Sequence, residues 1–359
     1  MNAKALSSSA AYRVVRGDAA RDKVKVLSVW RECGSDYSRE FADGAARYQW
    51  FYLQNPAGHA EVFFLEYAAT GRTVGVVGLG TREFWRRGVK MRAGVIVDFI
   101  VHPEHRVFYP ALLLQRAVRE SAFESCGLLI GHLDKRSGAV IRRAGYRPLA
   151  FRRFARVIGF SRYLARYVPR PVAVVPGRLI AAVDSVVVGA RRRFGVQIEW
   201  SWAERFDDRY EFLWKQQVAS GISMGCRSQN FLEWRFGARP PCKYRILELT
   251  RASSQELVGY FVLQIARDTL TVADFLLPPG AAARKAALLA VVAAASQARV
   301  TRVTVSVVGD ASIRASFAAA GFREREPETM LIAERADSAG DAGHESAPNW
   351  YFTFADVDT

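Results

Sequence analysis

The chain has 359 residues, of which 50% are hydrophobic and 12% aromatic. This length can hold two domains with complete cores, and the composition excludes an intrinsically disordered chain. The formal net charge is +16, from 51 basic against 35 acidic side chains. Such an excess favours an anionic partner, such as a nucleotide-containing cofactor, an acidic carrier protein, nucleic acid or an anionic membrane, and a solvated basic surface is the alternative.

Cysteine and histidine usage argues against a metal centre. The protein has five histidines and four widely separated cysteines, with no CxxC pair, at Cys33, Cys126, Cys226 and Cys242. A disulfide framework and a structural zinc site are both disfavoured by this pattern, and we expect no metal. No signal peptide is visible, and no apolar run is both long and uninterrupted enough to span a bilayer. These features predict a cytoplasmic protein.

In chain order, the first regular elements are a strand at Tyr12–Val15 and a helix at Ala20–Glu32. The runs Val62–Tyr67 and Thr73–Leu79 are apolar or alternating and flank a turn containing Gly71, which predicts a β-hairpin. The polar residues 81–88 are expected to form a loop or the start of a further hairpin.

The most apolar stretch follows. Val95–Val101 is nearly all apolar or β-branched, which predicts a strand buried on both faces. Pro103 ends this strand, because proline lacks the N–H that a sheet needs. Pro110 occupies the place of a first helical residue, and apolar residues recur after it at helical spacing. A second strand at Leu128–Ile130 and a helix that ends at Gly145 complete a strand–helix–strand–helix unit.

Two short patterns lie at the turns of this unit. Val101, Pro103 and Arg106 form V-x-P-x-x-R at the end of the strand, and Ala144-Gly145-Tyr146 closes the second helix. In this order, the unit resembles the GNAT superfamily of N-acyltransferases. The resemblance implies an α/β fold with a mixed sheet and an acyl-CoA co-substrate whose pantetheine pairs with a splayed first strand. It also implies a pyrophosphate bound by N–H groups at the following helix N-terminus. An α/β core without a ligand is the alternative.

The sequence also contains an internal repeat. Trp50 to Gly75 spans 25 positions, and so does Trp234 to Gly259. Asp98 precedes Gly145 by 47 positions, and Asp274 precedes Gly321 by the same interval. The offset between the copies is 184 early and 176 later, so an eight-residue difference lies between Gly259 and Asp274. This predicts two tandem GNAT-like domains.

The resemblance implies acyl-CoA contacts in either copy. In the first copy they fall on Phe99, Val101, Arg106 and Ala111. Residues 107–111 are bulky and include a proline, which obstructs a close cradle of amides. In the second copy the corresponding loop has small and basic residues, and the contacts would be Gly280, Ala282, Arg284 and Lys285. This loop is the more natural pyrophosphate seat.

The catalytic candidates are Asp98 and Asp274, because each is an acidic residue within an apolar strand. Burial without a cation would raise the pKa of such a group toward that of a useful base. The alternatives are an exposed carboxylate and one paired with a neighbouring arginine. His102 and His105 are further candidates near the strand's end. Many GNAT members carry a tyrosine as leaving-group acid before the A-G-[YF] glycine, but here Ile141 and Phe317 stand in that position.

Four segments are predicted: a first GNAT-like domain at 1–155, a basic connection at 156–203, a second GNAT-like domain at 204–335, and a loop with a docking strand at 336–359. Basic and aromatic residues interleave at Phe151–Val168. They could contact a membrane peripherally or bind single-stranded nucleic acid, and the alternative is sheet strands with arginines in water. The aromatic residues of Asn349–Asp358 predict a strand that docks back onto the protein.

These features favour an N-acyltransferase that moves an acyl group from acyl-CoA or an acyl carrier protein to a small amine. The F-L-x-W-R stretch at 231–235 resembles bacterial tandem proteins that acylate amino sugars or amino acids. A catalytically silent scaffold that recruits an anionic partner is the alternative. No compact nucleic-acid recognition motif is present, so no specific nucleic-acid partner is expected.

Overall fold

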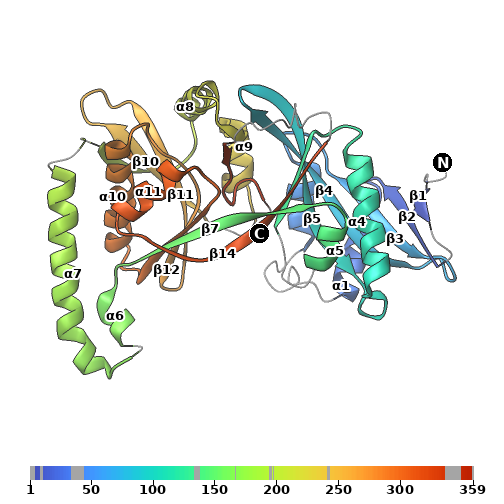
Figure 1. Ribbon diagram of the computed structural model, residues 1–359, viewed down its shortest axis with the longest axis horizontal. Helices are drawn as coiled ribbons and strands as arrows, with labels where there is room; N and C mark the ends of the chain where they lie inside the picture. The colour runs from blue at the N-terminus through green and yellow to red at the C-terminus, as the bar shows by residue number, and fades with distance from the viewer. Residues whose placement is uncertain are drawn as a thin grey trace.

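The computed structural model describes residues 5–8, 11–33, 44–132, 138–165, 167–193, 196, 198–240, 243–335 and 349–357. Its strands form one mixed sheet that runs through both halves of the molecule, in the order β1-β2-β3-β4-β5-β6-β14-β7-β13-β12-β11-β10-β8 (Figure 1). The short strands β9 and β15 lie off this path. The α/β class with a mixed sheet is therefore confirmed.

The first half contains the strands and helices that the sequence predicts, with some extensions. Its strands are β1 (Ala5–Ser8), β2 (Tyr12–Gly17), β3 (Glu61–Tyr67), β4 (Thr73–Arg86), β5 (Val89–Val101), β6 (Leu128–His132) and β7 (Arg147–Val157). Its helices are α1 (Lys23–Glu32), α3 (Gly44–Tyr48), the π-helix η1 (Gln49–Leu53), the 3-10 turn η2 (Pro103–His105), α4 (Phe108–Ala122) and α5 (Gly138–Arg143). Strand β1, which the sequence did not predict, pairs with β2.

The second half repeats this order after two connecting helices, α6 (Phe160–Leu164) and α7 (Arg170–Arg193). Its strands are β8 (Ile198–Ala203), β9 (Ser223–Gly225), β10 (Arg245–Arg251), β11 (Leu257–Ala266), β12 (Thr269–Leu276), β13 (Arg302–Val307), β14 (Arg323–Glu334) and β15 (Trp350–Tyr351). Its helices are α8 (Asp208–Ala219), α9 (Gln229–Leu232), the π-helix η4 (Glu233–Gly237), α10 (Ala281–Gln297) and α11 (Ala311–Ala319).

Helices cover both faces of the sheet. In β4, Val77 packs with the buried face of α4, while its neighbour Val76 packs with Trp30 of α1 on the opposite side. Successive residues of a strand point to opposite faces, so both contacts come from one apolar run. This arrangement explains why the strands of the first half read as continuously apolar segments.

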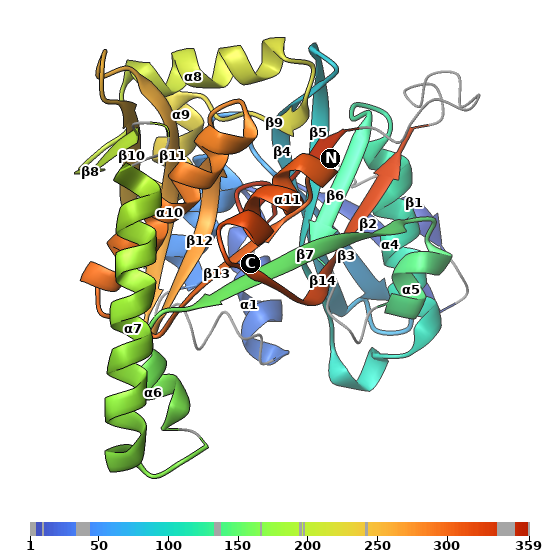
Figure 2. The ribbon, with the colours of Figure 1, turned by 60° about the vertical axis from the view of Figure 1, so that its left-hand side comes forward.

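The two halves exchange their last strands. Strand β7 of the first half pairs with β13 of the second, and β14 of the second half pairs with β6 of the first. The two exchanged strands also pair with each other, from Arg323↔Ala155 to Ile332↔Arg147 (Figure 2). Each half thereby covers the sheet edge of the other, which would otherwise be an open template for association. No sequence pattern indicated this exchange.

A pair of stacked tryptophans lies between the halves. The Trp50 and Trp234 rings stack with centroids 5.1 Å apart and an interplanar angle of 18°. Each indole N–H donates to the backbone oxygen of the other residue, at 2.7 Å for Trp50 and 3.0 Å for Trp234. The two π-helices that carry these residues are related by the offset of 184. The contact is reciprocal, as at the axis of a two-fold symmetric pair.

Replacing Trp234 with alanine is expected to lower the free energy of unfolding by about 3–5 kcal/mol, because a buried ring, its stacking partner and a hydrogen bond are lost together. Urea denaturation would measure this change. Trp202→Ala is the matched control, since this side chain is only half-buried. Similar losses in the two variants would contradict a special role for the stacked pair.

The longer hairpin of the first half accounts for the eight-residue difference between the copies. Strands β4 and β5 extend well beyond their counterparts β11 and β12. Near the hairpin's tip, Phe84 and Trp85 pair with Gly225 and Met224 of β9. The extra residues therefore form an arm that contacts the second half. Residues 81–86, for which a loop was one expectation, belong to this arm.

Three cysteines, Cys33, Cys126 and Cys226, are free thiols, while Cys242 lies outside the described residues. Within the part of the chain that the structure describes, no helix has both the length and the apolar character needed to cross a bilayer. The predicted loop at 336–348 and Asp358 also lie outside the described residues. The predicted segment boundaries stay predictions.

Candidate functional site

In the first half, two neighbouring strands separate at their carboxyl ends, and we call the gap between them the first parting. Strands β5 and β6 pair in parallel from Ala93↔Leu128 to Ile96↔Gly131. Beyond Ile96, β5 continues to Val101 along β4 alone. Among the described residues, no strand therefore pairs with the β6-facing edge of 97–101. Such an edge offers backbone donors and acceptors to an extended ligand.

In the second half, the chain's own C-terminal segment, residues 350–357, fills the corresponding gap, which we call the second parting. Strands β12 and β13 pair in parallel only as far as Val272↔Val305. Phe352 then exchanges two backbone hydrogen bonds with Val308, at 2.9 and 3.1 Å. The Tyr351 hydroxyl donates to the backbone oxygen of Phe275. The prediction that this segment docks is confirmed, and its docking closes the second parting.

Asp274 lies under this C-terminal segment in a closed ionic cluster. Nε of Arg227 is 3.1 Å from both carboxylate oxygens of Asp274, and the other guanidinium nitrogens lie 2.8 and 2.5 Å from the oxygens of Asp356. The hydroxyls of Thr353 and Tyr260 donate to Asp274 at 2.6 and 2.7 Å. The Arg227 and Asp274 side chains are completely buried. An incoming amine therefore has no access to this carboxylate.

Burial raises the pKa of Asp274, and the second carboxylate, Asp356, acts in the same direction, while Arg227 opposes both. Burial likewise raises the pKa of Tyr260 well above its ordinary value, so this phenol stays protonated and donates. The cluster holds one guanidinium between two carboxylates. Its hydrogen bonds join β12, the segment before α9 and the C-terminal segment.

Asp98 is also paired with an arginine, although its position differs. Arg47 of α3 donates to its Oδ2 at 2.8 Å, and the Tyr52 hydroxyl donates to the same oxygen at 2.6 Å. The residue lies at an irregularity of β5 with a positive φ of 52°, a conformation in which non-glycine residues are rare. Gly78 makes room for the phenol, since a Cβ there would be 2.2 Å from the Tyr52 hydroxyl.

The arginine-paired alternative is thus confirmed for both aspartates. Their role as general bases stays a prediction, and the structure does not bring the two together in one site. Each instead joins its strand to an arginine of its own half.

The predicted donor contacts of the first half surround the end of β5. Phe99 is half-buried and Val101 is buried. The guanidinium of Arg106 folds back and donates to the backbone oxygen of Val101 at 3.1 and 3.2 Å. Ala111 is buried in the first turn of α4, behind the exposed rings of Phe108 and Tyr109. Arg106 therefore caps the strand end.

The predicted contacts of the second half lie at the start of α10. Gly280 precedes the helix with a φ of 87°, and a Cβ there would meet no atom within 4 Å. Ala282 is exposed, and Lys285 is half-buried. Arg284 donates to the Ser312 hydroxyl, which donates to Asp310 at 2.7 Å. The N-terminus of α10 is therefore accessible, but the C-terminal segment closes the adjacent gap between β12 and β13.

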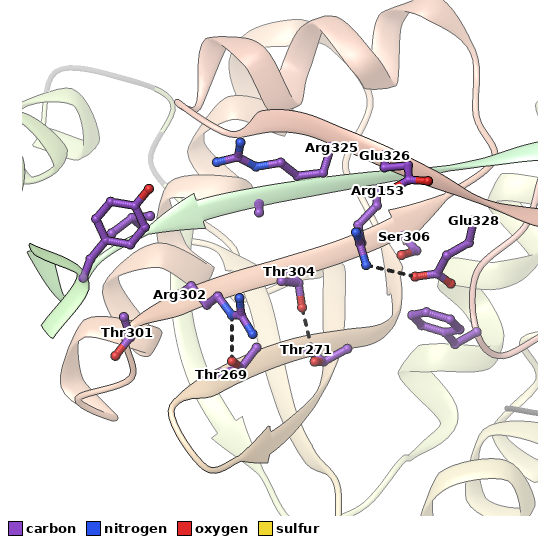
Figure 3. A pocket seen from close by; sticks show the side chains of 14 residues that line it. Arg153, Thr269, Thr271, Thr301, Arg302, Thr304, Ser306, Arg325, Glu326 and Glu328 are labelled. Carbon is purple, nitrogen blue, oxygen red and sulfur yellow. Dashed lines mark hydrogen bonds and ion pairs between the residues drawn. The ribbon is translucent and has the colours of Figure 1, made fainter. Parts of the chain in front are cut away.

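A polar cavity of about 590 Å³ lies on the sheet beside the exchanged strands (Figure 3). Hydroxyl side chains and charged groups line most of it, with aromatic rings at two places. Arg302 donates to Thr269 at 2.9 Å, and the Thr271 and Thr304 hydroxyls are 3.2 Å apart. Its lining includes Thr271, Thr304, Arg153, Arg325, Glu326 and Glu328. We call this space the polar cavity.

Glu328 connects the polar cavity to the first parting. Its Oε2 is 3.4 Å from Nε2 of His132, and its Oε1 is 3.7 Å from Arg153. His132 directly follows Gly131, the last residue of β6 that pairs with β5. Sequence reasoning missed His132 and Glu328, because only the exchange of β14 brings the two residues together. The expected histidines, His102 and His105, lie in and just before the 3-10 turn η2, directly after the end of β5.

Among the described residues, no three histidine, cysteine or acidic side chains are grouped so that they could hold a metal ion. A second cavity of about 510 Å³ lies along α1 and β4 and is lined by charged surface residues. Neither aspartate lines either of these two cavities.

Comparison with known proteins finds no matching protein-family model and no matching curated protein. Solved structures do match. One from Enterococcus faecalis, described as a conserved protein of unknown function and probable N-acyltransferase, has a TM-score of 0.61 and 13% identity, over 90% of this chain and 72% of that one.

Two further structures are informative. A tandem GNAT protein from the clavulanic acid biosynthesis pathway has a TM-score of 0.51 and 13% identity, over 90% of this chain and 98% of that one. An N-myristoyltransferase from Saccharomyces cerevisiae with bound myristoyl-CoA has a TM-score of 0.52 and 12% identity, over 93% of this chain and 81% of that one. The chain therefore has the tandem GNAT fold.

Proposed function

We propose that the protein is an N-acyltransferase that moves an acyl group from acyl-CoA, or from an acyl carrier protein, to the amino group of a small acceptor such as an amino sugar or amino acid. The observation that carries this proposal is the parting of β5 and β6, which the contact between His132 and Glu328 links to the polar cavity. The fold, and the myristoyl-CoA bound in the yeast structure, support the same reading.

The donor binds to the first half. Its pantetheine extends along Val97–Val101, where the strand edge is not paired within the described sheet. The anionic end of the donor lies toward the N-terminus of α4, whose dipole and N–H groups favour phosphate, although Pro110 supplies no N–H. The second half does not bind the donor, because residues 350–353 fill its parting.

The acceptor binds in the polar cavity. Its threonine hydroxyls can bind the hydroxyl groups of an amino sugar, and Arg153 and Arg325 suit a carboxylate or phosphate. Glu326 and Glu328 attract an ammonium group to the end of the cavity that lies near His132.

The reaction needs one proton acceptor and one donor. His132 takes the proton of the acceptor's ammonium group, and Glu328 orients the imidazole. The free amine then attacks the thioester carbonyl, and the tetrahedral intermediate expels the thiolate of coenzyme A. His132, which has released its first proton to solvent, takes the second proton from the nitrogen of the intermediate and delivers it to the thiolate, so that the amide, the thiol of coenzyme A and one released proton are formed. Asp98 remains the other predicted base, but Arg47 and Tyr52 already occupy one of its oxygens.

Calorimetric titration with acetyl-CoA, followed by a thiol-release assay with amino sugars and amino acids, tests this proposal. We expect binding at micromolar to millimolar concentrations and thiol release with at least one acceptor. Absence of binding at millimolar acetyl-CoA would overturn it. A cytoplasmic location, where acyl-CoA is available and free thiols stay reduced, belongs to the same proposal.

Thr304→Val tests the acceptor assignment with an isosteric change. Loss of one hydroxyl is expected to raise the acceptor KM roughly threefold to tenfold while the acetyl-CoA Kd stays unchanged. The matched control is Thr70→Val, in an exposed turn outside the cavity. An unchanged acceptor KM in Thr304→Val would argue against binding in the polar cavity.

The second candidate function is a catalytically silent scaffold that recruits an anionic partner. The closed second parting and the arginine-paired aspartates favour it. It predicts no thiol release with any amine acceptor, whether or not acetyl-CoA binds.

A further inference from the structure

Helix α7 lies on the outside of the second half, where it runs beside α10 and away from the exchanged strands (Figures 1 and 2). One side of the helix is fixed to the protein. Ala173 is completely buried, and the α-carbon of Gly177 approaches α6 so closely that a Cβ would lie 2.4 Å from the backbone of Ser161. The inner face of α7 is therefore well defined.

The opposite face of α7 is apolar and exposed. Five aliphatic side chains are spaced three, four, four and three residues apart, so they lie on one side of the helix. Each is between 61% and 71% exposed, and they are Val172, Val175, Leu179, Val183 and Val186. We call this set the aliphatic stripe. Tyr167, just before the helix, is 72% exposed.

Charge on and around α7 is strongly basic. The helix sequence contains five arginines, namely Arg170, Arg178 and 191–193, against the single acidic residue Asp184. Arg178 is exposed within the length of the stripe. The protein as a whole carries a net charge of +16. An apolar stripe with basic flanks and an aromatic residue at one end is the pattern of a helix that lies in a membrane interface.

We propose that the aliphatic stripe of α7 docks the protein on an anionic lipid surface, with the helix in the plane of the interface. The side chains of the stripe enter the boundary between headgroups and acyl chains, Arg178 contacts anionic headgroups, and the basic sequence at both helix ends favours an anionic surface. A second copy of the chain fits the stripe less well, because two facing copies would bring arginines together in either orientation. The helix does not meet the requirements of a membrane span.

The proposed membrane contact therefore lies on α7, which follows the segment Phe151–Val168 for which the sequence predicted it. Phe151 and Phe154 are buried in the sheet, and Arg152 pairs with Glu324 at 2.5 Å. The strand alternative is thus confirmed for residues up to Val157, except that Arg156 is buried and not in water. The aliphatic stripe is on a separate helix, so its role is independent of the proposed acyl transfer.

Co-sedimentation of the full chain with vesicles tests the proposal. We expect binding to vesicles that contain about one-third phosphatidylglycerol in phosphatidylcholine, and much weaker binding to phosphatidylcholine alone. Leu179→Asp is expected to lower the partition coefficient at least about tenfold, because it removes one aliphatic side chain that would enter the lipid and adds a negative charge. Raising the salt concentration is expected to weaken binding.

The matched control is Val24→Asp on α1, since Val24 is 74% exposed but lies on another helix. Its partition coefficient should stay within a factor of three of that of the unaltered protein. Val175→Asp provides a second stripe variant in case Leu179→Asp unfolds. No binding to anionic vesicles, or equal binding by stripe and control variants, would overturn the proposal. So would a dimer in sedimentation that Leu179→Asp converts to a monomer.

Discussion

Replacing Arg227 with methionine is expected to lower the free energy of unfolding at pH 7.5 by about 4 kcal/mol, because it leaves two buried carboxylates without their cation. Arg227 donates to both Asp274 and Asp356, and all three side chains are almost completely buried. The same change removes one of the links between the C-terminal segment and β12. Urea denaturation monitored by tryptophan fluorescence would measure it.

The loss should depend on pH in a defined direction. The pKa of Asp274 is already raised by burial in the native protein, and removal of Arg227 raises it further. A carboxyl whose pKa is higher in the folded than in the unfolded state stabilises the fold below its unfolded pKa, and this stabilisation is lost as the pH rises through the folded pKa. The free energy of unfolding that Arg227→Met loses relative to the unaltered protein should therefore be smaller at pH 5 than at pH 7.5.

Arg209→Met is the control for this experiment. Arg209 also contacts two carboxylates, Asp207 and Glu248, but its side chain is 46% exposed. Partly exposed ion pairs contribute little, so we expect a loss of no more than about 1 kcal/mol. Equal losses for Arg209→Met and Arg227→Met, or a deficit that grows as the pH falls, would contradict the account of the buried cluster.

Replacing His132 with alanine is expected to lower kcat about 100-fold or more, because general-base catalysis typically contributes a factor of that size. The acetyl-CoA Kd should stay unchanged, since the imidazole accepts the proton of the acceptor and does not bind the donor. Steady-state thiol release and calorimetric titration measure these two effects.

Glu328→Gln separates orientation from proton transfer. The amide preserves the shape of the side chain that lies 3.4 Å from His132, so a smaller fall in kcat, about tenfold, is expected. His59→Ala is the control, because His59 is exposed in a turn before β3. If His132→Ala keeps kcat within a factor of three of the unaltered enzyme, His132 is not the base and Asp98 becomes the leading candidate.

The repeat was predictable because its markers have structural reasons. Trp50 and Trp234 recur at a constant offset because they stack across the pseudo-two-fold axis. Asp98 and Asp274 recur because each ties an apolar strand to an arginine of its own half. Local signals, such as apolar runs, Pro103 and the glycines after helices, also gave most element positions. The positions of the other elements depend on tertiary packing and left no local signal.

The exchange of β7 and β14 could not be predicted from the sequence. A strand that pairs within its own half and one that pairs across halves have the same alternating pattern. The contact between His132 and Glu328 follows from this exchange, so it left no motif. The docking of the C-terminal segment was predictable from its aromatic residues, but its place in the second parting was not.

Hydrogen exchange with and without acetyl-CoA tests most directly which half binds the donor. Slower amide exchange is expected along Val97–Val101 when acetyl-CoA is added, because the pantetheine pairs with the edge that no described strand covers. Exchange along Val272–Leu276 should not change, since Tyr351 and Phe352 already fill the second parting. Protection that appears only along Val272–Leu276, or along neither strand at saturating acetyl-CoA, would contradict donor binding in the first half.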